Sequence, residues 1–345
     1  MEATLRHIQR TIPPLLILSP LIVVIASGCG DTTSPDGWDD AEPMPTARGE
    51  VSAAVGEREQ GCDTPPCEVV AVVGGFGYPA KTLDRVDGYI PDEDRWIELP
   101  DLPEPRHHPA AAGLPDGTIV VTGGAPSATD EVPTDDVWAL APDADGWESL
   151  DPLPEGRWAH RLVSVGDRLV SIGGHGGDST HLWEPGVGWS EGHAIPRQRD
   201  HLGAVVIDDE VWAIGGRDPE SKARIDIYNP GEDQWRDGPQ LPEPTSAAAV
   251  GVVDDFLVVV SGEDYGGVTG GIIEAAWMLD LTDDDGSWRP LVEPPLHVHG
   301  AGDAVVGQPG DQRLLVLGGA DWHAHWSALS WTDRVQVLHD PTPAD

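Results

Sequence analysis

The segment from residue 321 to 326 concentrates side chains that could bind a ligand. It contains Asp321, Trp322, His323 and His325. Two histidines at alternate positions beside a carboxylate could ligate a metal ion, and the tryptophan could instead stack on a sugar ring or an aromatic ligand. Two nitrogens and one oxygen do not specify a metal. We therefore predict ligand-binding residues here and no metal site.

Motifs of the common enzyme classes are absent from the sequence. There is no serine elbow, no phosphate-cradling loop and no zinc-protease helix. The run Gly174-His-Gly-Gly177 follows a strand-like segment but opens no helix, so it is no dinucleotide fingerprint. The acidic runs 143–146 and 283–286 lack the first ligand and the distal glutamate of a calcium loop, and we interpret them as turns. We predict no catalytic residue and no cofactor.

The charge of the chain excludes one class of partner. It has 20 Lys and Arg against 60 Asp and Glu, a formal net charge of −40. Nucleic-acid binding needs a basic surface, so we predict no nucleic-acid partner. The acidity indicates a well-solvated surface.

The N-terminus indicates export. Arg6 and Arg10 precede an apolar run over residues 15–25, and Ala-Ser-Gly-Cys29 follows. This tetrad resembles the lipobox of bacterial lipoproteins, which implies a lipid anchor on Cys29, although Ala26 stands where leucine is commoner. We predict a signal peptide over 1–28 and a polar tether over 29–36. The protein would then be exported and lipid-anchored to a bacterial membrane, at the outer membrane or cell surface rather than the inner membrane. An ordinary secretory peptide or an uncleaved anchor helix is the alternative.

The two remaining cysteines form an even pair. Cys62 and Cys67 would lie in an oxidising compartment if the chain is exported. That favours a local disulfide over a metal site, because two thiols alone make a poor zinc site.

One pattern recurs six times from residue 37 onward. An apolar run ends in a glycine pair, and an alternating strand, an acidic turn, a tryptophan and a proline-rich link follow. The second glycine of each pair is at 75, 124, 174, 216, 262 or 319, and Ser261 replaces the first glycine of the fifth pair. Tryptophans fall in step at 96, 147, 189, 235 and 288. The third unit divides into four strand-like runs, 161–165, 168–172, 180–184 and 189–192.

This repeat resembles the kelch family, in which each unit of about 50 residues is one four-stranded propeller blade. The resemblance implies an all-β, six-bladed propeller over residues 37–345. The sixth unit ends without its tryptophan, and Gly37-Trp38 near the start supplies a matching segment. We therefore expect the N-terminal segment to provide the outer strand that closes the last blade.

The kelch topology implies that the links between blades and the loops after the glycine pairs emerge on the same face. Arg157, Arg199, Arg217 and His299 lie in these segments, which predicts a ligand-binding mouth. Arginines and histidines of the link also commonly brace the blades of kelch proteins, so a structural role for them is the alternative.

The predicted function is a non-catalytic binding or scaffold module at the cell envelope, with a protein or a glycan as partner. The alternative is a carbohydrate-active enzyme of the epimerase or lyase type that uses the same mouth, with Glu263 beside the arginines. A copper radical oxidase would need a free cysteine in the propeller, and only Cys62 and Cys67 are present.

Overall fold

The computed structural model describes residues 37–79, 81–129, 131–267, 271–283, 286–321 and 331–341. All of them fall within one compact unit that spans Thr33–Asp345. Cys29, the predicted signal peptide and the predicted tether lie outside the described residues. In the described part, no helix has the length and apolar character that crossing a membrane requires.

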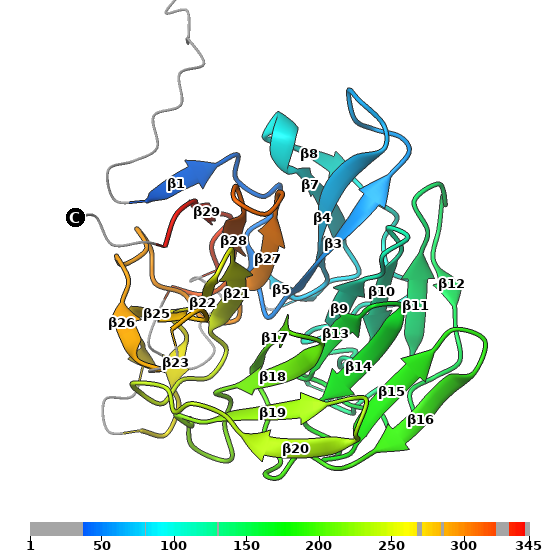
Figure 1. Ribbon diagram of the computed structural model, residues 1–345. Coiled ribbons are helices and arrows are strands. Elements are labelled where there is room, and N and C mark those ends of the chain that lie inside the picture. Colours follow the sequence, from blue (N-terminus) through cyan, green and yellow to red (C-terminus); the bar gives the residue numbers. More distant parts are fainter. Residues whose placement is uncertain are drawn as a thin grey trace, which may run out of the picture. The chain divides into compact units, whose positions relative to one another are not determined.

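The described residues form six four-stranded antiparallel sheets. The first three are β3 (Ser52–Arg58), β4 (Cys67–Val73), β7 (Val86–Ile90) and β8 (Arg95–Glu98); β9 (Ala110–Gly113), β10 (Ile119–Thr122), β11 (Val137–Leu140) and β12 (Glu148–Ser149); and β13 (Arg161–Val165), β14 (Arg168–Ile172), β15 (Thr180–Glu184) and β16 (Gly188–Gly192). The next two are β17 (Gly203–Ile207), β18 (Glu210–Ile214), β19 (Ile225–Asn229) and β20 (Gln234–Asp237); and β21 (Ala249–Val253), β22 (Phe256–Val260), β25 (Ala276–Asp280) and β26 (Trp288–Pro290). Figure 1 shows the sheets following one another along the colour gradient.

The sixth sheet joins the two ends of the described chain. It consists of β27 (Gly302–Val306), β28 (Arg313–Leu317), β29 (Val335–Leu338) and, at its edge, β1 (Trp38–Ala41). β1 pairs antiparallel with β29, from Trp38 opposite Leu338 to Ala41 opposite Val335. The N-terminal segment thus supplies an outer strand to a C-terminal sheet, as its sequence predicts.

Short elements fill the connections. They are β2 (Arg48–Gly49), β5 (Phe76–Gly77) and β6 (Lys81–Thr82) in one small sheet, β23 (Glu263–Asp264) and β24 (Gly271–Ile272) in another, and the helical turn η1 (Pro91–Glu93). Cys62, in the connection between β3 and β4, forms the predicted disulfide with Cys67, the first residue of β4.

The glycine pairs mark places where two connections come very close together. Gly74 and Gly75 both have positive φ, 59° and 90°, and Ser261 at the fifth pair also has a φ of 54°. A Cβ atom on Gly74 would lie 2.3 Å from the carbonyl oxygen of Arg106. Glycine is therefore required there by both backbone conformation and space.

Apolar clusters form between consecutive sheets. Val69 and Ala71 of β4, for example, pack with Ile119 and Val121 of β10. The repeating tryptophans reach toward the preceding sheet, because the Trp96 indole donates to the Glu42 carbonyl and the Trp235 indole donates to the His193 carbonyl. These features are consistent with a kelch-type β-propeller, in which each sheet needs a neighbour to bury its faces.

Candidate functional site

Links and loops meet at one end of each sheet. In the sheet β17–β20, the link that carries Arg199 enters β17, and the loop that carries Arg217 joins the end of β18 to the start of β19. β20 also ends on this side, since it runs antiparallel to β19. We call this side of the sheets the loop end.

Arg157 and Arg199 turn inward from the loop end. Arg157 is fully buried and donates to the carbonyls of Gly173 and Ser179 and to Nε2 of His181. Burial lowers the pKa of Arg157 to about 10. Its guanidinium therefore braces its own sheet, and its ligand-binding role stays a prediction.

Arg199 is anchored in the same manner. It donates to the carbonyls of Ala213 and Gly215, and it forms a 2.8 Å ion pair with the completely buried Asp226. Burial lowers the pKa of Arg199, against the raising effect of Asp226. The contacts place its guanidinium beneath the surface of the loop end.

A cycle of backbone hydrogen bonds connects the six links. In each link, one residue donates its backbone amide to the carbonyl of the equivalent residue in the preceding link. The six donor–acceptor distances are 2.7 to 3.1 Å. We call these residues the collar, and they are Glu50, His108, Ala159, His201, Ala247 and Gly300. Each has a φ between 50° and 62°. Five of the six are not glycine, and a positive φ strains the backbone of such residues. Strain of this kind often occurs at functional sites.

Polar side chains gather at the collar. His108 Nε2 lies 3.0 Å from a carboxylate oxygen of Glu50, and His299 Nδ1 lies 3.6 Å from the other. Ligand atoms of Glu50, His108 and His201 all lie within 4.8 Å of one another. These three residues line a cavity of about 40 Å³, which is large enough for an ion or a water molecule.

Arg217 links this cluster to the loops. It contacts carboxylate oxygens of Asp200 at 3.0 Å and Glu263 at 2.5 Å, and it donates to Nε2 of His201 at 3.2 Å. Its guanidinium also lies 4.2 Å from the ring centre of Tyr265. Arg217 and His299 are therefore the two predicted site residues that the structure brings to the collar.

Burial and the neighbouring charges have opposite effects on the pKa values of Glu50 and His299. Burial alone would raise the pKa of Glu50, but the adjoining His108 and His299 outweigh it and hold the pKa well below its usual range. Burial alone would lower the pKa of His299, but the Glu50 carboxylate outweighs it and raises the pKa. Glu50 is thus ionised at neutral pH.

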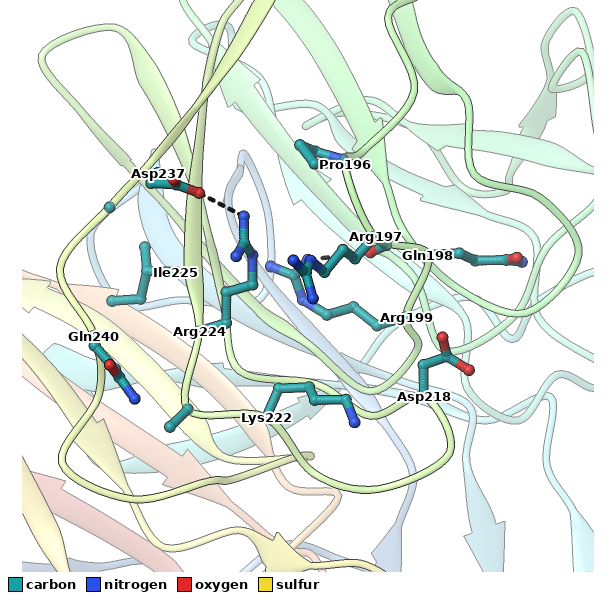
Figure 2. A pocket seen from close by; sticks show the side chains of 12 residues that line it. Pro196, Arg197, Gln198, Arg199, Asp218, Lys222, Arg224, Ile225, Asp237 and Gln240 are labelled. Atoms are coloured by element: carbon teal, nitrogen blue, oxygen red, sulfur yellow. Dashed lines mark hydrogen bonds and ion pairs between the residues drawn. The ribbon is translucent and has the colours of Figure 1, made fainter.

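A second feature of the loop end is a basic cavity. It has a volume of about 890 Å³ and lies where the links and loops of the sheet β17–β20 converge. Figure 2 shows its lining, in which Arg197, Arg199, Lys222 and Arg224 face Asp218 and Asp237. Arg224 pairs with Asp237 at 2.6 Å, whereas Arg197 and Lys222 form no ion pair within the described part of the chain. We call this feature the basic cavity.

Of the predicted segment 321–326, the structure describes only Asp321, which lines neither the basic cavity nor the cavity at the collar. Asp321 is exposed. Trp322, His323 and His325 lie outside the described residues.

Comparisons with known proteins agree with the repeat pattern. Residues 198–242 match the family model for the Kelch motif. Mouse Kelch-like protein 35 is 26% identical over 273 residues, which cover 77% of this chain and 44% of the mouse protein. Kelch-like protein terF of Aspergillus terreus is 24% identical over 278 residues, covering 70% of this chain and 60% of that protein. Beta-scruin of Limulus polyphemus is 26% identical over 238 residues, which cover 62% of this chain and 24% of beta-scruin.

The comparisons support a kelch-repeat family for this chain. The matched motif contains all four strands β17–β20 together with Arg217, Lys222 and Arg224. The chain spans less than half the length of the mouse kelch-like relative.

Two parts of the site are not predicted from the sequence. The basic cavity could have been found from the density of basic residues over 197–224 in a strongly acidic chain. The position of Glu50 beside His108 and His201 could have been found only by aligning the six links position by position.

Proposed function

We propose that this chain is a non-catalytic binding module, a closed six-bladed propeller that is held at a bacterial cell envelope by a lipid on Cys29. Its partner is a protein with an acidic segment that enters the basic cavity. The similarity to kelch-like proteins supports a binding module, and the cavity supplies the chemistry of recognition.

The closed ring is supported by contacts between the sheets. The first strands of consecutive sheets contact one another in chain order from β3 through β9, β13, β17 and β21 to β27, and β27 contacts β3. The collar hydrogen bonds run through the same six links. A rigid ring of this kind holds its loops in fixed positions, as a binding surface requires.

The observation that carries the binding role is the positive charge of the basic cavity. Four basic side chains line it against Asp218 and Asp237, and the buried Asp226 pairs with two of the four, Arg199 and Arg224. One positive charge remains in excess, in a chain with a net charge of −40. Arg197 is exposed, and neither it nor Lys222 is neutralised by an ion pair from the described residues. Carboxylates of a partner can provide the missing charges, and Arg197 offers a planar donor fork for them.

Charge reversal tests the partner chemistry. A fluorescent oligoglutamate peptide should bind the wild-type chain, and the double variant Arg197→Glu with Lys222→Glu should bind it at least about tenfold more weakly, because two attractive contacts become repulsive. Binding is measured by fluorescence anisotropy, and it should also weaken with added salt.

The matched control for this experiment is the double variant Arg236→Glu with Arg289→Glu, which makes the same charge change on the outer strands β20 and β26, outside the basic cavity. It should retain wild-type affinity. Equal losses in both variants, or no binding by the wild type, would contradict the proposal. Binding of a uronic-acid oligosaccharide but not of the peptide would assign the cavity to a glycan instead.

The envelope anchor has a separate test. Replacing Cys29 by Ala should move the protein from the membrane fraction to the soluble fraction, because the thiol that would carry the lipid is gone. Cell fractionation followed by immunoblotting measures the distribution. An unchanged membrane fraction would refute the anchor and leave the binding role standing.

A further inference from the structure

The hydrogen bonds around His107 determine what His108 presents at the collar. His107 Nε2 lies 3.1 Å from the Ser127 carbonyl, which can only accept, so this nitrogen carries a hydrogen. His107 is completely buried, which favours a neutral ring whose Nδ1 is an acceptor. His108 Nδ1, 2.6 Å away, must then donate to it. His108 therefore turns its Nε2 toward Glu50.

His201 is oriented by an equivalent contact. Its Nδ1 lies 2.6 Å from a carboxylate oxygen of Asp200, so Nδ1 carries the hydrogen and the lone pair of Nε2 accepts a hydrogen bond from Arg217. Histidines that bind metals are held in this way, with one ring nitrogen donating to a carboxylate or a buried acceptor and the other facing the ion. Both collar histidines have Nδ1 held in this way, and an ion at Nε2 of His201 would take the place of Arg217.

The charge and size of the collar suit a small cation. Glu50, Asp200 and Glu263 bring three negative charges to the cluster, and Arg217 brings one positive charge. With neutral histidines the cluster carries a net charge of −2. The cavity of about 40 Å³ is lined by Glu50, His108 and His201 themselves.

We propose that the collar binds a divalent transition-metal ion such as Zn²⁺ through Nε2 of His108, Nε2 of His201 and the carboxylate of Glu50. Imidazole nitrogens with one carboxylate are a ligand set that Zn²⁺ prefers over the oxygen sets of Ca²⁺ and Mg²⁺. Donor atoms around tetrahedral zinc lie about 3.3 Å apart. The 3.0 Å between His108 and Glu50 is close to this. Ligation by His201, whose ligand atom lies within 4.8 Å of the other two, requires Arg217 to release Nε2.

His299 lies beside this group but outside it. Its Nδ1 is buried and lies 3.6 Å from Glu50, and it is not among the three residues whose ligand atoms all lie within 4.8 Å of one another. The ion would connect the links that precede β3, β9 and β17, so binding should stabilise the protein.

Metal titration of the chelator-treated full chain tests the site. Zn²⁺ at about 100 times its dissociation constant should raise the melting temperature by roughly 5 °C, because only the folded chain has the site. Ca²⁺ and Mg²⁺ should leave the melting temperature unchanged. Co²⁺ should bind with the intense visible absorption of a four-coordinate site, which a protonated His108–Glu50 pair cannot produce.

Variants locate the ion at the collar. His108→Gln and His201→Asn should abolish the shift, and Asp200→Asn, which keeps all ligands but loses the orienting carboxylate, should weaken Zn²⁺ affinity by about 10- to 100-fold. The control is His193→Asn. His193 also contacts an aspartate, Asp233, at 2.8 Å, but it is exposed, directly follows the outer strand β16 and does not line the cavity at the collar.

The absence of a Zn²⁺ shift in the wild type would overturn the proposal, and so would a shift that persists in the His108 and His201 variants. If those two variants fail to fold, as judged by circular dichroism, Asp200→Asn and the Co²⁺ spectrum of the wild type decide the question. Neither readout involves the basic cavity.

Discussion

Deletion of residues 37–44 is expected to lower the melting temperature by roughly 10 °C or more. The deletion removes β1 and with it Trp38 and Met44, which are 2% and 3% exposed. Loss of one fully buried large side chain costs about 3–5 kcal/mol, and here two are lost together with a strand ladder. It also exposes β29 as an unpaired edge, which favours aggregation.

Two matched variants make this result specific, with thermal unfolding followed by circular dichroism. Deleting residues 30–36 of the predicted tether 29–36, which keeps Cys29, should leave the melting temperature within about 1 °C of wild type. Trp38→Ala should destabilise by about 3–5 kcal/mol on its own, because Trp38 packs against Val258 and Leu314 and its indole donates to the Val292 carbonyl. A melting temperature like that of the full-length protein after deletion of 37–44 would refute the structural role of β1.

The sequence predicts the sheets well because each depends on a local pattern. In the third unit the predicted strands 161–165, 168–172 and 180–184 match β13, β14 and β15, and the fourth begins one residue earlier than predicted, at Gly188. The glycine pairs also predict the positive φ angles that end the second strands. These features follow from the alternation of apolar residues and from turn chemistry within one unit.

The direction in which a polar side chain points is not encoded locally. Arg157 and Arg217 both belong to predicted mouth segments, yet Arg157 is fully buried in its sheet and Arg217 reaches the collar. The difference arises from partners distant in sequence, such as the Ser179 carbonyl for Arg157 and Glu263 for Arg217. Residue types therefore placed both arginines in the same predicted mouth but could not separate a buried brace from a group that reaches the collar.

Asp226 connects the stability of a sheet to the shape of the basic cavity. It is completely buried on β19 and pairs with Arg199 beneath the cavity and with Arg224 at its wall. Asp226→Ala should destabilise the protein by about 3–5 kcal/mol, because the buried Arg199 guanidinium is left without its counter-charge. Chemical denaturation measures the loss of unfolding free energy.

Comparison with two other changes isolates the charge as the cause. Asp237→Ala removes a second partner of Arg224, but Asp237 is 83% exposed and its loss should cost at most about 0.5 kcal/mol. The double variant Arg199→Met with Asp226→Leu removes both buried charges, and it should recover most of the stability that Asp226→Ala loses, because a buried ion pair contributes little net free energy once its desolvation is counted. If the double variant is as unstable as Asp226→Ala, the stabilisation comes instead from the hydrogen bonds that Arg199 donates to Ala213 and Gly215. Those bonds would then be what fixes the floor of the basic cavity.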